Sequence, residues 1–367
     1  MMKSKLAILI GLVALASTAH AAEIYNKDSN KLDLYGKVKA EHDFTSSESN
    51  SDHTYARLGF KGETQIANGV VGYGQFEHQF NAYQAEGSQT ESTRLAFAGL
   101  DLGDYGSIDY GRNYGIQYDI GSYTDVLTEF GGDSFQNVDN YMNQRTTGVL
   151  TYRNKNFFGL VDGLALGLQY QGANEDKRDP LESNGEGFGT SLQYEIPDSG
   201  VTLGAAYSRA KTTDQNFKGE FKGNDISYHP VFGDTAEAWS VGAKYDANSI
   251  MLATMYTETH NMTPLTAKVK GEDDSYPFFT DKSKAFEAIA GYTFDFGLQP
   301  TVGYVQQRAE LAGHSFDAVK YVQLGAAYYF NKNFAVDAAY KINLLKDGNN
   351  LGLATDDQTV LGATYQF

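Results

Sequence analysis

The amino-acid sequence predicts an all-β protein, a 16-stranded antiparallel β-barrel that spans a membrane. The chain begins with the features of an export signal, and its final residues, 359–367, alternate between two faces as a β-strand does. It contains 26 Tyr and 22 Phe, yet beyond residue 21 no stretch approaches the ~18 apolar residues of a membrane-spanning helix. A transmembrane barrel with aromatic girdles explains these features together. A soluble all-β protein is the alternative.

The first residues have the layout of a cleaved signal peptide. Lys3 and Lys5 precede an apolar run from residue 6 to residue 16, and Ala19-His20-Ala21 forms a small-residue cleavage motif. We expect residues 1–21 to be the signal peptide and residues 22–367 to form the barrel. An anchored N-terminal helix is the alternative, but the apolar run is shorter than the ~20 residues that span a bilayer.

Composition excludes several classes of function. The formal net charge of −17 argues against nucleic acid as a partner, because binding phosphates needs clustered Lys and Arg. The absence of Cys excludes disulfides and thiolate metal sites. The His residues are dispersed, and no zinc-protease, serine-hydrolase or phosphate-loop motif occurs. We therefore expect no enzymatic activity, no metal and no cofactor.

Turn signals divide the chain into strands. Short turns alternate with longer polar segments, such as residues 45–53, 174–187, 212–234 and 262–282, as in membrane barrels with short turns at one end. Seven short turns join fourteen strands, and the first and last strands make sixteen. These two must pair, because an open edge is not tolerated in lipid. The short turns are expected at 68–69, 103–104, 154–156, 197–200, 246–248, 295–299 and 331–333.

Charged residues lie on the polar face of the expected strands. In residues 32–44, apolar side chains alternate with polar ones, which places Lys37 in the lumen. The same alternation in the next strand places Arg57 there. In residues 93–97, Arg94 lies opposite Leu95 and Phe97, which we expect to face lipid, so Arg94 is also expected to point inward. Taken alone, each cation is better explained as an ordinary wet lumen residue, but cations at three lumen-facing strand positions together favour a functional cluster.

The longest segment without strand signals runs from residue 114 to residue 144. It carries several carboxylates, and Gly131-Gly132 would permit a sharp backbone turn. If the segment folds into the lumen, its carboxylates face the basic residues across a narrowed pore, and charged side chains at a constriction select among solutes. An acidic loop that stays outside the barrel is the alternative.

Several segments together resemble one family across nearly the whole mature length. The chain resembles the trimeric general-diffusion porins of the OmpF/OmpC type. The matching segments are residues 22–28, 33–37, 54–65 (TYARLGFKGETQ), 93–100 (TRLAFAGL), 109–115 (DYGRNYG), 129–133 (EFGGD), 151–154, 156–163 (NFFGLVDG) and 365–367. This resemblance implies an outer-membrane location in a Gram-negative bacterium. It also implies that the third loop folds inward and forms a charged constriction.

The resemblance also implies roles for individual residues. The basic cluster of the constriction falls on Lys37, Arg57, Arg94 and Arg145, and its acidic partners on Asp125 and Glu129. The constriction loop includes Tyr118, Gly131, Gly132 and Asp133. A homotrimer is implied, in which a latch loop at residues 82–92 reaches the neighbouring subunit and Glu86 pairs with Arg112. Further implied partners are outer-membrane lipid, lipopolysaccharide and, through Phe367, the barrel-assembly machinery.

One departure from the family pattern falls in the constriction loop. The family usually has Pro before the Glu of the loop motif, whereas this chain has Thr128, which leaves the loop path open. The expected function is a water-filled channel for passive diffusion of ions and small hydrophilic solutes. A substrate-preferring channel and an outer-membrane adhesin or structural anchor are the alternatives.

Overall fold

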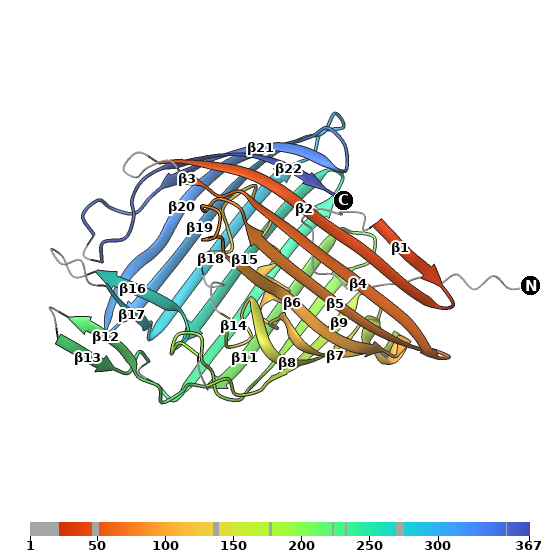
Figure 1. Ribbon diagram of the computed structural model, residues 1–367, viewed down its shortest axis with the longest axis horizontal. Helices are drawn as coiled ribbons and strands as arrows, with labels where there is room; N and C mark the ends of the chain where they lie inside the picture. Colours follow the sequence, from red (N-terminus) through yellow and green to blue (C-terminus); the bar gives the residue numbers. More distant parts are fainter. Residues whose placement is uncertain are drawn as a thin grey trace, which may run out of the picture.

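A computed structural model describes residues 22–45, 51–134, 139–175, 178–221, 224–231, 233–268, 275–349 and 351–367. The expected signal peptide, residues 1–21, lies outside the described residues. The described chain is nearly all β-sheet, and its long strands run obliquely around a closed barrel (Figure 1). The predicted fold class, a 16-stranded antiparallel barrel, is confirmed.

Each barrel strand pairs with the next along the chain in antiparallel register. The strands are β2 (Asn30–Thr45), β4 (Tyr55–Ala67), β5 (Val70–Asn81), β6 (Glu91–Asp101), β7 (Ser107–Tyr114), β8 (Arg145–Asn154), β9 (Leu164–Gln171), β10 (Gly187–Ile196), β11 (Val201–Lys211), β14 (Thr235–Ala247), β15 (Ile250–His260), β18 (Lys282–Tyr292), β19 (Leu298–Leu311), β20 (His314–Tyr329), β21 (Phe334–Asn343) and β22 (Gln358–Gln366).

The first and last barrel strands close the sheet, as predicted. β2 pairs with β22 from Lys37↔Gln366 to Thr45↔Gln358. Past the end of β22, the Phe367 amide donates to the Gly36 carbonyl at 3.0 Å. A short strand that the sequence analysis did not predict, β1 (Ala22–Lys27), pairs with the other end of β2, from Ala22↔Leu34 to Lys27↔Asn30. β1 and β22 therefore lie one after the other along β2. The two-residue β3 (Ser51–Asp52) also joins β2.

Alternating side chains give the barrel an apolar exterior and a polar interior. Along β2 and β4, Val38, Leu58 and Phe60 are exposed on the outer face, whereas Lys37, Lys39 and Arg57 are more enclosed. The terminal strand follows the same rule, because Leu361 and Tyr365 are exposed and Val360 is buried. Since adjacent residues of a strand point to opposite faces, the outer row faces lipid and the inner row faces the lumen.

A β-bulge in β6 changes the face on which the following residues lie. The register passes from His78↔Thr93 to Glu77↔Leu95, so Arg94 is an extra residue opposite the β5 strand. Two residues then oppose one, and the alternation shifts by one position. Leu95 is buried, whereas the next residue, Ala96, is exposed. The expectation that Leu95 and Phe97 face lipid is therefore wrong; the bulge turns Arg94 and Leu95 to the same, inner, side.

The connections at one end of the barrel are short, with one exception. β4 and β5 join through Asn68-Gly69, and β14 and β15 through Asn248-Ser249. The expected turn at 154–156 is instead a longer connection, residues 155–163, which contains the short helix α2 (Asn156–Gly159). Asn154 Oδ1 accepts from the Phe158 amide at 2.6 Å and stabilises this turn. The 3-10 helix η1 (Gly103–Tyr105) lies in the connection between β6 and β7.

The opposite end carries the long loops, two of which contain small hairpins that the sequence analysis did not predict. β12 (Phe217–Phe221) pairs with β13 (Asn224–Tyr228), and β16 (Pro264–Lys268) pairs with β17 (Ser275–Phe279). Both hairpins lie at the end of the barrel away from β1 (Figure 1). The Tyr228 hydroxyl donates to the Pro277 carbonyl at 2.8 Å and so connects the two loops. Among the described residues, no helix is long and apolar enough to cross a membrane.

Candidate functional site

Between β7 and β8, the described residues 115–134 and 139–144 form a segment that folds along the inside of the barrel wall. At its base the two stems continue the sheet, since the Gly115 amide donates to the Gln144 carbonyl at 2.6 Å. The Ile116 amide donates to Gln169 of β9 at 2.9 Å, and Gln117 donates to Ser208 of β11 at 3.0 Å. These partners lie on the inner faces of their strands, so the loop enters the lumen, as the fold prediction required.

Further along, one buried carboxylate holds both arms of the loop. Glu287 of β18 is fully buried and accepts from the Thr124 hydroxyl at 2.6 Å and from the Ser134 hydroxyl at 2.5 Å. The short helix α1 (Tyr118–Gly121) precedes Thr124, and Ile120 and Tyr123 pack on small wall residues of β11, β15 and β18. A buried carboxylate is stable only when its oxygens are hydrogen-bonded, so Glu287 and the two hydroxyls stabilise one another.

The loop tip rests on β19 and β20. Thr128 lies 3.0 Å from Thr301, hydroxyl to hydroxyl, and the Phe130 amide donates to Gln323 at 2.9 Å. The Tyr321 hydroxyl donates to Asp133 at 2.9 Å. Thr128 therefore makes a wall contact that a proline at that position lacks the hydroxyl to make. Gly131 and Gly132 have φ of 106° and 65°, a region that favours glycine, and they allow the chain to reverse here.

The basic residues lie on the neighbouring part of the wall. Lys37 and Arg57 are direct cross-strand partners, and each cation lies 5.3 Å from the centre of the Tyr55 ring. Arg94 and Arg145 continue the row on β6 and at the start of β8, and the guanidinium groups of Arg57, Arg94 and Arg145 are close enough to repel one another. The structure therefore brings the four sequence-predicted basic residues into one cluster.

A carboxylate that was not predicted from the sequence lies within this cluster. Glu77 of β5 accepts from Arg94 Nε at 2.6 Å and lies 3.8 Å from Arg57 Nε. The Tyr35 hydroxyl also donates to it, at 3.1 Å. Glu77 offsets part of the repulsion among the cations and fixes the direction of Arg94. The alternation of residues 70–81 was a sufficient signal, because it places Glu77 on the polar face with Tyr73 and Gln75.

The two carboxylates expected to face the cations are placed differently. Asp125 accepts from the Tyr118 hydroxyl at 2.6 Å, and the Tyr118 ring stacks on Tyr114. Glu129 is bound by Lys39 of β2. Across the described part of the chain, neither carboxylate lies within ion-pair distance of the four basic side chains. The arrangement is thus an acidic loop across from a basic wall, without direct pairing.

The order of strands around the barrel sets the two sides of this arrangement. The four basic residues lie on strands from β2 to β8, whereas most wall contacts of the loop fall on strands from β9 to β20. The loop also reaches β8, where Arg153 donates to Asp119 at 2.8 Å, and β2, where Lys39 donates to Glu129. Cations on one side and carboxylates on the other create a transverse field across the remaining opening. The described residues include no group of three or more His, Cys, Asp or Glu side chains suited to a metal ion.

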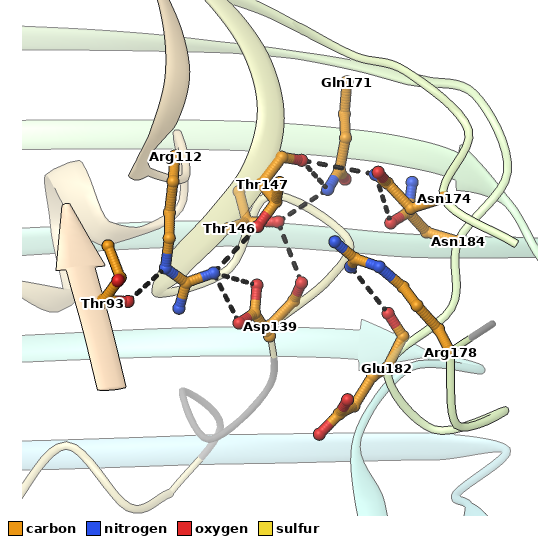
Figure 2. A network of polar contacts seen from close by, with 10 residues as sticks. All are labelled: Thr93, Arg112, Asp139, Thr146, Thr147, Gln171, Asn174, Arg178, Glu182 and Asn184. Atoms are coloured by element: carbon orange, nitrogen blue, oxygen red, sulfur yellow. Dashed lines mark hydrogen bonds and ion pairs between the residues drawn. The ribbon is translucent and has the colours of Figure 1, made fainter. Parts of the chain in front are cut away.

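Among the described residues of this single chain, no ion pair joins the two residues of the expected latch. Glu86 is exposed in the loop between β5 and β6. Arg112 instead forms an ion pair with Asp139 of its own chain at 2.5 Å, and it donates to the Thr93 carbonyl and the Thr147 hydroxyl, as Figure 2 shows. The Asp139 carbonyl accepts from Thr146, so this network ties the returning arm of the inner loop to β8.

The base of the loop leaves no room for a side chain at residue 115. A Cβ on Gly115 would lie 2.0 Å from the Met142 carbonyl carbon, which belongs to the opposite stem. We therefore expect Gly115→Ala to separate the stems and to destabilise the folded protein by about 1–3 kcal/mol, the usual cost of overpacking. The temperature at which the folded barrel unfolds on a heat-modifiability gel measures this. Gly62→Ala is the control, because a Cβ there would have only an ordinary contact, 3.9 Å from Leu32. An equal unfolding temperature for Gly115→Ala and the native protein would contradict the expectation.

A lipid-facing exterior, a polar interior and a loop that lines the lumen opposite a row of cations define a membrane channel of the β-barrel class. A family model described as Gram-negative porin matches residues 27–367. The chain is 51% identical over 378 residues to a putative outer membrane porin protein NmpC from Escherichia coli K12, which covers 99% of this chain and 100% of the relative. It is 49% identical to the outer membrane porin PhoE of Salmonella typhimurium LT2, with 100% of both chains covered.

A solved structure agrees with these relatives. The Salmonella typhi OmpF complex with daunomycin superimposes with a TM-score of 0.84 at 46% sequence identity, and it covers 94% of this chain and 100% of the other. The chain therefore belongs to the Gram-negative porin family. It is a multi-pass β-barrel of the bacterial outer membrane that forms a channel for the passive diffusion of ions and small hydrophilic solutes.

Proposed function

We propose that the basic cluster and the inner loop together form the constriction that sets the selectivity of this porin. The basic side consists of Lys37, Arg57, Arg94 and Arg145, and the loop side carries Asp125, with Tyr118, Gly131, Gly132 and Asp133 shaping the loop. The observation that carries the proposal is the route of the loop, which is hydrogen-bonded mainly to wall strands from β9 to β20, while the four cations occupy β2 to β8 and none of them pairs with a described carboxylate of the loop. Solutes that pass must therefore move between opposite charges.

The size limit of this constriction is testable with neutral solutes. Liposomes that contain the purified protein should swell in isotonic solutions of small sugars, at rates that fall steeply as the sugar grows. An open, unconstricted barrel would instead pass small and large sugars at similar rates, and a plugged barrel would pass none. The assay needs no charge on the solute, so it separates the width of the constriction from its field.

The ion preference of the channel should be modest and toward cations. The chain carries a net charge of −17, and charge of one sign at a pore mouth raises the local concentration of the opposite ion. The basic cluster opposes this effect without cancelling it. The reversal potential in a KCl gradient across a planar bilayer measures the preference directly, and a clear preference for chloride would contradict the expectation.

We propose that the porin is a homotrimer in which residues 82–92 reach a neighbouring subunit and Glu86 pairs with Arg112 there. The exposure of Glu86 supports this, and the Arg112 side chain stays 20% exposed although it is paired with Asp139. Glu86→Gln should lower the temperature at which the trimer dissociates in detergent, whereas Asp347→Asn, a matched change at an exposed acid of another loop, should leave it unchanged. Equal dissociation temperatures for Glu86→Gln and the native protein would exclude this contact.

Three further roles belong to the same proposal. Residues 1–21 act as a signal peptide, so N-terminal sequencing of the mature protein should begin at Ala22. Phe367 presents the last strand to the barrel-assembly machinery, and lipopolysaccharide surrounds the outer end. The porin has no enzymatic activity, and incubation of the purified protein with phospholipid should release no fatty acid.

A further inference from the structure

A cluster of four charged side chains lies where the loop tip meets the wall. Lys39 of β2 donates to Glu129 of the loop. Its Nζ also lies 3.3 Å from Glu41 Oε2 on the same strand and 4.0 Å from Asp337 Oδ2 on β21. On β22, Gly362 is the register partner of both Asp337 and Glu41, and Lys39 lies two residues before Glu41. Gly362 has no side chain to fill this space: a Cβ there would lie 2.3 Å from Asp337 Oδ2.

The cluster is shielded from water. The side chains of Lys39, Glu129 and Asp337 are 10%, 4% and 8% exposed. Burial, followed by the hydrogen bond to Asp337, raises the pKa of the Glu129 carboxyl, whereas Lys39 favours its charged form. Whether the proton rests on Glu129 or on Lys39, the pair presents little of the negative charge that an open carboxylate would present to the lumen.

From this geometry we infer that Lys39 and Asp337 are specificity-determining residues, which withhold the Glu129 carboxylate from the constriction and so lower the cation preference of the channel. The inference rests on the proposed constriction. The field of an ion pair falls off faster with distance than that of a single charge, so a solute in the lumen responds to Asp125 more than to Glu129. Lys39 supplies the neutralising charge, and Asp337 keeps the ammonium group at the loop tip.

A double variant tests this without changing the net charge of the lumen. Lys39→Gln with Asp337→Asn removes one positive and one negative charge and leaves both Glu129 and Glu41 without the ammonium group that they contact. A further Glu129→Gln change separates the effect of Glu129 from that of Glu41. A lone buried carboxylate is unstable, so Glu129 should turn to the water of the lumen. In a KCl gradient, the ratio of potassium to chloride permeability should rise about twofold in the double variant, the effect expected of one added charge several ångströms from the ion path. Adding Glu129→Gln should reverse this rise.

The same Glu129→Gln change in the native background provides the decisive comparison. We expect it to shift the permeability ratio far less than it does in the double variant, a non-additive result that reports coupling between the residues. Equal shifts in the two backgrounds would overturn the inference. The control is Lys31→Gln with Asp33→Asn, which removes another ion pair of β2, at 2.5 Å, and should leave the ratio and the effect of Glu129→Gln unchanged.

Failure of the native protein to conduct and failure of the double variant to fold have different consequences. If the native protein forms no conducting channel, the proposed function fails, and not this inference alone. If the double variant does not fold, the native chain still provides a test: Asp125→Asn should lower the permeability ratio more than Glu129→Gln does. Equal effects of these two single changes would mean that Glu129 is not withheld.

Discussion

Glu287→Ala should widen the size limit of the channel more than any other single change in the loop anchors. Glu287 accepts hydrogen bonds from Thr124 and Ser134, which lie on the two arms of the inner loop. Its removal leaves two hydroxyls without their acceptor. Hydrogen bonds to a charged group contribute about 1.5–3 kcal/mol each, so the loop loses several kcal/mol of attachment at this point. Larger sugars should then enter liposomes faster, and the single-channel current should become noisier.

The matched control for this change is Glu287→Gln. The amide has nearly the same shape and keeps hydrogen-bonding atoms toward both hydroxyls, so most of the native exclusion should remain. Heat-modifiability of both variants shows whether the barrel itself has folded. If Glu287→Ala excludes the same sugars as the native protein and shows no added noise, the loop is held without this carboxylate and our account of the anchor is wrong.

Arg94→Ala should have the second large effect, on ion selectivity. Arg94 is the bulged residue of β6, and it donates to Glu77 at 2.6 Å. Without it, the basic side loses a charge, and Glu77 keeps its hydrogen bond from Tyr35 but has only the more distant Arg57, at 3.8 Å, as a cationic partner. We expect a higher conductance and a roughly two- to fivefold higher ratio of potassium to chloride permeability, as the loss of one charge near the ion path implies. Reversal potentials and single-channel currents measure both.

Two controls separate charge from position. Arg94→Lys keeps the charge and should leave the selectivity near the native value. Arg209 of β11 is paired with Glu237 of β14 at 3.0 Å, and it shares the outer face with Leu203 and Tyr207. Arg209→Ala should therefore not alter the channel. Unchanged selectivity and sugar exclusion in Arg94→Ala would show that Arg94 does not line the constriction.

Alternation along the strands predicted most of the fold. The lumen-facing positions of Lys37 and Arg57 followed directly from it, because each lies in a regular part of its strand. Arg94 was assigned to the correct side for a reason that the structure contradicts. A bulge reverses the alternation after residue 94, and no Gly or Pro in residues 91–97 marks it. The strand at residues 22–27 was missed because its turn, Asp28-Ser29, uses positive φ without glycine.

The wall residues that bind the inner loop could not be predicted from sequence patterns. Lys39 and Glu129 are 90 positions apart, and Glu287 lies 163 positions from Thr124. Such contacts depend on the route of the loop through the lumen, and neither periodicity nor turn chemistry encodes that route. The family resemblance supplied the inward fold and the identity of the basic residues. The pairing of Glu129 with Lys39 and Asp337 emerged only from the three-dimensional arrangement.

Single-channel conductance of the purified protein in a planar bilayer tests the central claim most directly. A constricted but open lumen predicts large, persistent openings with a conductance below that of an unobstructed barrel, and a trimer predicts closure in three equal steps at high voltage. A correctly folded, heat-modifiable barrel that conducts no current would mean that the loop closes the lumen, and it would contradict our account.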